Sequence, residues 1–120
     1  MREDVRKYLI EVARKQGMCT YSDVNNACNL GLTWDGDHGS GEIGRILGEV
    51  AKFEHDKGRP VLSAVVVGKN TGEQGKGFYK ICEEMGLGNA KKLQENFFAI
   101  DEMKRCQEFW SNDENYAKYY

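Results

Sequence analysis

The chain has 120 residues, of which 40% are hydrophobic and 30% charged; this composition is typical of one globular domain and excludes wholesale disorder. The formal net charge of -2 disfavours a protein that coats duplex DNA, because such proteins usually carry a basic balance or a strong basic patch. No apolar run approaches the roughly 20 residues that span a bilayer, and the N-terminus lacks a secretory apolar region. We therefore expect a cytoplasmic protein without a membrane partner.

Spacing and capping signals indicate the first two helices. Apolar residues repeat at helical spacing over residues 5–13, with charged residues on the other side. Thr20 and Asp23 have the spacing of a capping box, so a short second helix is expected to begin there. Residues 32–39 are polar and rich in glycine, which favours an irregular stretch anchored by Trp34.

The third helix, expected over residues 40–55, has two unlike faces. Its apolar stripe consists of Ile43, Ile46, Leu47, Val50 and Phe53, and its opposite face of Gly41, Gly44, Arg45, Gly48 and Lys52. Each glycine inside a helix costs roughly 0.5 to 1 kcal/mol relative to alanine, so this face needs a reason. One reason is close contact with a ligand, a nucleic acid or another backbone, with Arg45 as the central charge. The other is tight packing against a helix or a frayed helix start, and the sequence leaves both open.

A β-branched run follows the only proline of the chain. Residues 61–67 are the strand candidate, because valine and its neighbours there suit a buried strand. Residues 68–77 are polar and rich in glycine, which favours a hairpin or wing with a short return strand at residues 78–79. A short helix is expected over residues 81–85, with a break at residues 86–88.

Asn89 is expected to cap one long last helix. The expected buried stripe of this helix consists of Leu93, Phe97, Ile100, Met103 and Trp110. Phe98 and Phe109 lie off the stripe, where a homo-oligomer contact or flanking loops would cover them equally well. Residues 111–120 are polar and are expected to form a frayed tail.

The order helix, helix, loop, helix, strand, wing is the order of a winged helix, in which the third helix and the wing usually meet nucleic acid. We therefore predict an α+β fold, a small winged-helix-like domain over residues 1–110 with a short β-hairpin wing and a long C-terminal helix. Residues 111–120 are its polar tail.

The cysteines are scattered and form no C-x-x-C pair; they are Cys19, Cys28, Cys82 and Cys106. With only His38 and His55 besides, the sequence shows neither a zinc-ligand spacing nor a Cys–His catalytic pair. Residues 35–39 are acidic and lack the register of an EF-hand loop, which favours an ordinary turn. We expect reduced, mostly buried thiols, no metal site and no cofactor.

Three segments carry a resemblance: Thr20-Tyr21-Ser22-Asp23-Val24, Glu42-Ile43-Gly44-Arg45-Ile46-Leu47-Gly48, and Leu62-Ser63-Ala64-Val65-Val66-Val67 followed by Gly72 and Gly75. In this order they resemble the T-Y-G-E-L-A helix start, the R-A-V-G-x-A helix and the P-C-H-R-V-V strand with its glycine-rich turn. These motifs belong to the C-terminal domain of alkylguanine DNA alkyltransferases and to alkyltransferase-like proteins. The resemblance covers residues 20–79, half of the chain.

This chain departs from the family at the two residues that make its nucleophile. Ser63 stands at the position of the reactive cysteine and Ala64 at that of the activating histidine, so alkyl transfer is not expected. The stretch between Tyr21 and Arg45 is also longer than in the family. The resemblance implies Tyr21 near a phosphate and Arg45 as a cation that probes a base stack or pairs with a phosphate. It also implies a recognition helix whose small residues suit a minor groove or a small ligand.

The glycine-rich loop has a second interpretation besides a plain surface wing. Its glycines expose backbone N–H groups and its lysines add positive charge, a combination that cradles phosphates, although the P-loop register is missing. If the loop folds toward Arg45, then Lys69, Lys76 and Arg45 bracket a dianionic ligand such as a nucleotide. The aromatic residues available to stack its base are Trp34, Phe78 and Tyr79.

We therefore predict a non-catalytic protein that holds a phosphate-bearing, nucleotide-type ligand through the third helix and the wing. Short proteins of this kind resemble those of phages and mobile elements that sequester nucleotide signals of host defence. The alternatives are a winged-helix DNA-binding protein and a protein–protein interaction module. The predicted binding residues are Tyr21, Ser22, Trp34, Gly41, Gly44, Arg45, Gly48, Ser63, Lys69, Asn70, Lys76, Phe78 and Tyr79.

Overall fold

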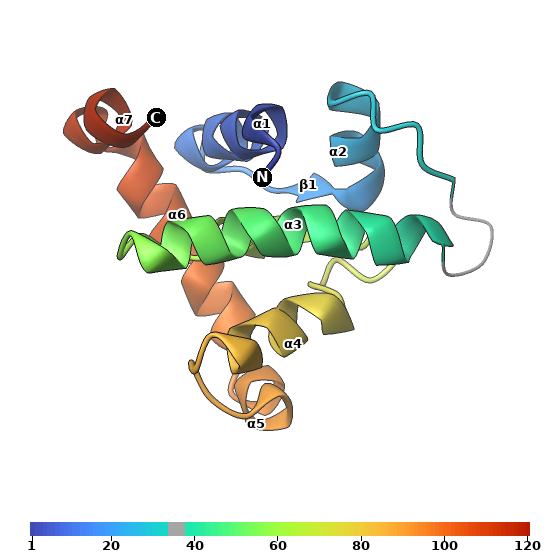
Figure 1. Cartoon of the computed structure of the whole chain (residues 1–120). Helices are drawn as coiled ribbons and strands as arrows, with labels where there is room; N and C mark the ends of the chain where they lie inside the picture. Colours follow the sequence, from blue (N-terminus) through green and yellow to red (C-terminus); the bar gives the residue numbers. More distant parts are fainter. Residues whose placement is uncertain (34–37) are drawn as a thin grey trace.

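The computed structural model describes residues 1–33 and 38–120 as a mostly helical fold with a two-stranded parallel sheet. Helix α3 crosses the middle of the molecule, with α1 and α2 on one side of it and α4 and α5 on the other (Figure 1). The elements are α1 (Glu3–Arg14), β1 (Cys19–Thr20), α2 (Tyr21–Ala27), α3 (His38–Asp56), the 3-10 helix η1 (Leu62–Val65), β2 (Val66–Val67), α4 (Lys76–Glu84), α5 (Ala90–Glu95), α6 (Phe98–Ser111) and α7 (Asp113–Tyr119). Within the described ranges, none of these helices has the length and apolar character needed to cross a membrane.

The first three helices form where the sequence predicts them. The capping box before α2 is present: the Thr20 hydroxyl accepts from the Asp23 N–H, and the Asp23 carboxylate accepts from the Thr20 N–H. Helix α3 begins at His38, so Gly44 and Gly48 lie beyond its first turn and a frayed helix start does not explain them. The predictions for Trp34 and for the acidic turn lie outside the described residues.

The predicted strand over residues 61–67 is wrong for most of its length. Only Val66 and Val67 form a strand, which pairs in parallel with Cys19 and Thr20, and the preceding four residues turn into η1. The β-branched pattern indicated burial correctly, because η1 is wholly buried and packs against α1, α3 and α6. It could not indicate that β1 offers only two residues as a sheet partner.

Side chains supply the hydrogen bonds that a sheet would have given to this buried segment. The N–H of Val61 donates to the carboxylate of Glu102 at 2.7 Å, and the carbonyl oxygen of Val61 accepts from the thiol of Cys106 at 3.2 Å. The carbonyl of Ala64 accepts from the side-chain amide of Gln74 at 2.7 Å. Because buried backbone groups need partners, these residues fix the path of the chain at the centre of the fold.

A buried ion pair connects α3 with both ends of the chain. Glu54 of α3 is fully buried, and its two carboxylate oxygens bind the guanidinium groups of Arg6 and Arg59. Arg6 also donates to the carbonyl oxygen of Tyr119 at 2.6 Å. The segment predicted as a frayed tail is thereby held in place, and residues 113–119 form helix α7 with Asn112 as its N-cap.

The predicted β-hairpin wing is also wrong. Residues 78–79, expected as a return strand, lie in the first half of α4, and the loop before them leads from β2 directly into that helix. The loop closes on itself, since the N–H of Gly68 donates to the carbonyl of Glu73 at 2.8 Å. The sequence did not indicate a helix start here, because Gly75 and Gly77 have low helix propensity.

The long last helix is two helices, α5 and α6. Asn89 caps α5 as predicted, but Phe97 has a left-handed backbone with φ of 59° and separates the two. The new register leaves Phe97 and Ile100 exposed, so the predicted stripe is wrong at both. The residues of α6 that are buried are Ala99, Glu102, Cys106 and Trp110.

We predict that Glu102→Ala lowers the free energy of unfolding by about 1–3 kcal/mol, because the buried N–H of Val61 loses its acceptor. Urea denaturation measures this change. Glu108→Ala, an exposed position on the same helix, is the control and should stay within about 0.5 kcal/mol of the unmodified protein. Equal effects of the two substitutions would show that the carboxylate of Glu102 does not support η1.

Candidate functional site

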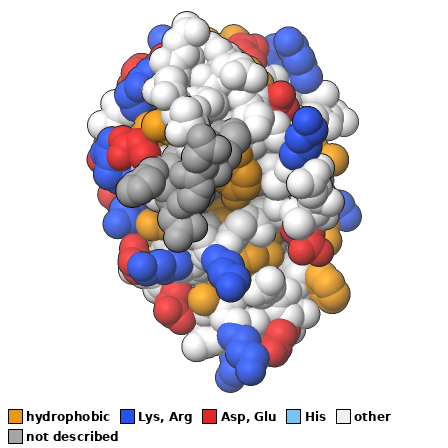
Figure 2. Space-filling view, turned by 90° about the vertical axis from the view of Figure 1, so that its right-hand side faces the viewer, with side chains coloured by type: hydrophobic (Ala, Val, Ile, Leu, Met, Phe, Trp, Pro, Cys, Tyr) orange, Lys and Arg blue, Asp and Glu red, His pale blue; other side chains and the backbone are white. Residues whose placement is uncertain are grey.

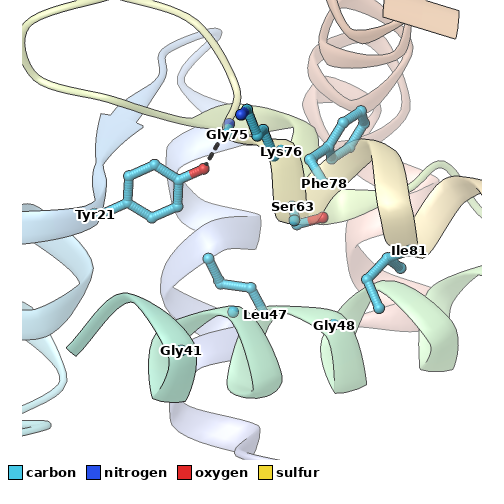
Figure 3. A pocket seen from close by; sticks show the side chains of 11 residues that line it. Tyr21, Gly41, Leu47, Gly48, Ser63, Gly75, Lys76, Phe78 and Ile81 are labelled. Carbon is cyan, nitrogen blue, oxygen red and sulfur yellow. Dashed lines mark hydrogen bonds between the residues drawn. The ribbon is translucent and has the colours of Figure 1, made fainter. Parts of the chain in front are cut away.

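A cavity of about 380 Å³ lies between the glycine face of α3, the serine of η1 and the start of α4 (Figure 3). Apolar side chains are exposed in the middle of the molecular face on this side, with charged side chains around them (Figure 2). The residues that line the cavity are Tyr21, Gly41, Gly44, Leu47, Gly48, Ser63, Gly75, Lys76, Gly77, Phe78 and Ile81. A volume of this size falls within the range of about 300–1,000 Å³ that is usual for small-molecule sites.

The glycines of α3 serve two different purposes. A Cβ atom placed on Gly48 would lie 3.0 Å from the Ile81 side chain, so this glycine allows α4 to pack closely against α3. A Cβ atom on Gly41 or Gly44 would meet nothing within 4 Å. Helix packing therefore explains one glycine, and the other two leave open space in the wall of the cavity.

Tyr21 fixes the point at which α4 begins. The N–H of Gly75 donates to the Tyr21 hydroxyl oxygen at 2.8 Å, and a Cβ atom on Gly75 would lie only 2.9 Å from that oxygen (Figure 3). Burial raises the pKa of Tyr21, which keeps its hydroxyl neutral at physiological pH. Gly75 is the N-cap of α4 and supplies no side-chain cap, so the positive end of the helix dipole remains uncapped beside the cavity.

Ser63 is a buried polar residue of the cavity wall. It lies between the side chains of α3 and those of α4 in Figure 3, and it is 7% exposed. Among the residues that the structure describes, no hydrogen bond engages its hydroxyl. A ligand in the cavity would give this hydroxyl a partner.

Lys76 supplies the charge of the site. It is the only charged residue among the described residues that line the cavity. Arg45, expected to be the central cation, is exposed and pairs instead with Glu42 and Glu49 along the outer face of α3. Arg45 therefore does not lie at the centre of the cavity, where the sequence predicts it.

The structure brings together about half of the residues predicted to bind. Those that line the cavity are Tyr21, Gly41, Gly44, Gly48, Ser63, Lys76 and Phe78, whereas Ser22, Arg45, Lys69, Asn70 and Tyr79 do not line it. Trp34 lies outside the described residues. Sequence reasoning missed Leu47, Gly75, Gly77 and Ile81; Leu47 belongs to the apolar stripe of its helix, and the glycines were assigned to a wing.

Burial favours the protonated form of the cysteine thiols at neutral pH. All four cysteines are free and buried, which confirms the prediction from their spacing. Burial raises the pKa of Cys19 and of Cys82 to about 12, so both stay protonated as thiols. Over residues 1–33 and 38–120, no group of three or more His, Cys, Asp and Glu side chains is arranged to hold a metal ion.

Comparison of the chain with protein-family models, with curated proteins and with solved structures gave no match.

We predict that the free energy of unfolding falls as the pH rises above 9, the ordinary pKa of a cysteine thiol. The thiols of the unfolded chain ionise first, while those of Cys19 and Cys82 remain protonated in the fold until about pH 12. The contribution of these two thiols to the free energy of unfolding is therefore fully present below pH 9 and is lost progressively above it. Urea denaturation across this range measures the slope, and Cys82→Ala should reduce it; an unchanged slope in the variant would contradict this account.

Proposed function

We propose that the cavity binds a small nucleotide-type ligand and holds it without chemical change. The observation that carries this proposal is the open space over Gly41 and Gly44, which faces apolar side chains on one side and Lys76 at the start of α4 on the other. A nucleotide has the same division into a flat apolar ring system and an anionic group. The sequence led to the same class of ligand by way of the same helix.

The walls of the cavity suit a flat ring. Glycine lets a ring approach the backbone of α3 closely, and Leu47, Phe78 and Ile81 supply apolar contact. Two aromatic rings pack against Phe78. The ring of Tyr79 lies edge-on to it, with 5.3 Å between the ring centroids, and the ring of Phe98 stacks on it, with 6.4 Å between the centroids. A rigid aromatic wall is favourable for stacking a base.

The residues of the wall argue against catalysis. Tyr21, Ser63 and Lys76 carry the nucleophilic atoms there, and no histidine, aspartate or glutamate is among the described residues that line the cavity. A hydroxyl without a histidine or carboxylate to take its proton is a weak nucleophile. A protein that holds a nucleotide unchanged lowers its free concentration, and sequestration of a nucleotide signal is the role that we propose.

We predict that Gly44→Leu abolishes ligand binding while the unliganded fold keeps its stability. A Cβ atom at this position meets nothing within 4 Å, so the new side chain extends into the cavity, and replacing a helical glycine stabilises the helix by about 0.5–1 kcal/mol. The measurement is the rise in Tm produced by nucleoside mono- and triphosphates, which should be lost in this variant.

Lys52→Leu is the matched control, because it places the same side chain on the same helix at an exposed position outside the cavity. Its Tm should rise with nucleotide as in the unmodified protein. If nucleotides stabilise Gly44→Leu as much as the control, the ligand lies elsewhere. If they stabilise none of the proteins, the proposed function is wrong.

A DNA-binding function is the second candidate, and one observation favours it. Ser63, which matches the reactive cysteine in the resemblance to alkyltransferase-like proteins, lines the same cavity as Tyr21 and the glycines of α3. A base extruded from a duplex would then occupy the cavity, with α3 beside the minor groove. Arg45, exposed on that helix, would meet the DNA.

Fluorescence anisotropy with a short duplex separates the two candidates. A DNA-binding protein should lose affinity steeply as salt is added, and Arg45→Ala should weaken its binding. Lys118→Ala, which removes a cation from α7 at the other end of the chain, is the control. An undetectable or salt-insensitive interaction would exclude this second function.

A further inference from the structure

We infer that the ligand carries a single phosphate group, and that this phosphate lies at the N-terminus of α4 beside Lys76. The inference rests on the proposed function and narrows it to nucleotides with one phosphate, either a monoester or a diester. Nucleoside triphosphates and other polyphosphates gain no affinity from their additional phosphates on this account.

The charge of the site sets the limit of one phosphate. Lys76 is the only charged residue among the described ones that line the cavity. The cations nearest along α3 are already neutralised, since Arg45 pairs with two glutamates and Lys52 lies 3.6 Å from a carboxylate oxygen of Glu84. Further phosphates would therefore find no second cation among the described residues of the cavity wall.

The start of α4 places the phosphate. The helix has nine residues, its N-cap is a glycine without a capping side chain, and its first two residues, Lys76 and Gly77, both line the cavity. Backbone N–H groups and the helix dipole at such an end favour an anion. The hydrogen bond from Gly75 to Tyr21 holds this end of the helix in position before a ligand arrives.

Ser63 gives an independent indication that a polar ligand fills the cavity. The residue as a whole is 7% exposed, it lines the cavity, and its hydroxyl is bonded to no described residue. A purely apolar ligand would leave this hydroxyl without a partner. We assign Ser63 to the polar edge of the base and Lys76 to the phosphate, so each residue contacts a different part of the nucleotide.

Isothermal titration calorimetry tests the inference with four sets of probes: nucleosides, 5′-monophosphates, 3′,5′-cyclic monophosphates and 5′-triphosphates, each with the bases adenine, guanine, cytosine and uracil. For the preferred base, adding one phosphate to the nucleoside should strengthen binding about tenfold, as one charge-assisted contact would. The triphosphate should bind no more tightly than the monophosphate. The better of the monophosphate and the cyclic form identifies a monoester or a diester ligand.

Two variants assign the roles. Lys76→Ala should weaken the nucleotide about tenfold and leave the nucleoside unchanged, whereas Ser63→Ala should weaken both. Lys80→Ala is the matched control, because this lysine is exposed on the same helix and does not line the cavity. It should bind as the unmodified protein does.

The possible failures are distinguishable. If no nucleoside or nucleotide binds, the proposed function falls and the inference falls with it. If nucleotides bind but affinity is independent of the phosphate, or of Lys76, the inference is overturned and the proposed function stands. Tighter binding of triphosphates overturns it likewise.

Discussion

The buried backbone at residues 61–64 is the constraint on which the rest of the fold depends. This segment lies among α1, α3 and α6, and the two-residue pairing of β2 with β1 begins only after it, at Val66. The backbone groups of Val61 and the carbonyl of Ala64 bind instead to the side chains of Glu102, Cys106 and Gln74, which come from two separate parts of the chain. Because an unpaired buried amide or carbonyl is costly, these contacts fix where η1 turns. The position of Ser63 in the cavity wall follows from that turn.

The cavity follows from the same arrangement. Helix α3 packs against η1 and α4, and at Gly48 the Ile81 side chain of α4 occupies space that a Cβ atom would need. One turn earlier, Gly44 has no neighbour to fill the space that its missing side chain leaves. Tyr21 then ties the start of α4 to α2, so an uncapped helix end and Lys76 lie at the edge of an apolar space. Binding, rather than chemistry, is the role that we propose for this wall.

The sequence predicted the parts of this arrangement that depend on local signals. Helical periodicity predicted α1 and α3, and capping residues predicted the starts of α2 and α5. The cost of glycine in a helix indicated Gly41 and Gly44 as candidate site residues. What it could not predict depends on partners distant in the chain. The β-branched run at residues 61–67 indicated a strand because burial by three helices produces the same pattern. The left-handed backbone at Phe97 divides the predicted last helix in two. Such a backbone is usual for glycine, and no glycine stands at this position to indicate it.

The central claim is that a nucleotide occupies the cavity beside the glycine face of α3. Nuclear magnetic resonance tests it directly, by following the backbone amide signals of the glycines in nitrogen-15-labelled protein as nucleoside monophosphates are added. The account predicts that the signals of Gly41, Gly44, Gly75 and Gly77 move, whereas those of Gly17, Gly58 and Gly86, none of which line the cavity, stay in place. Signals that do not move at all, or that move only at the glycines remote from the cavity, would contradict it.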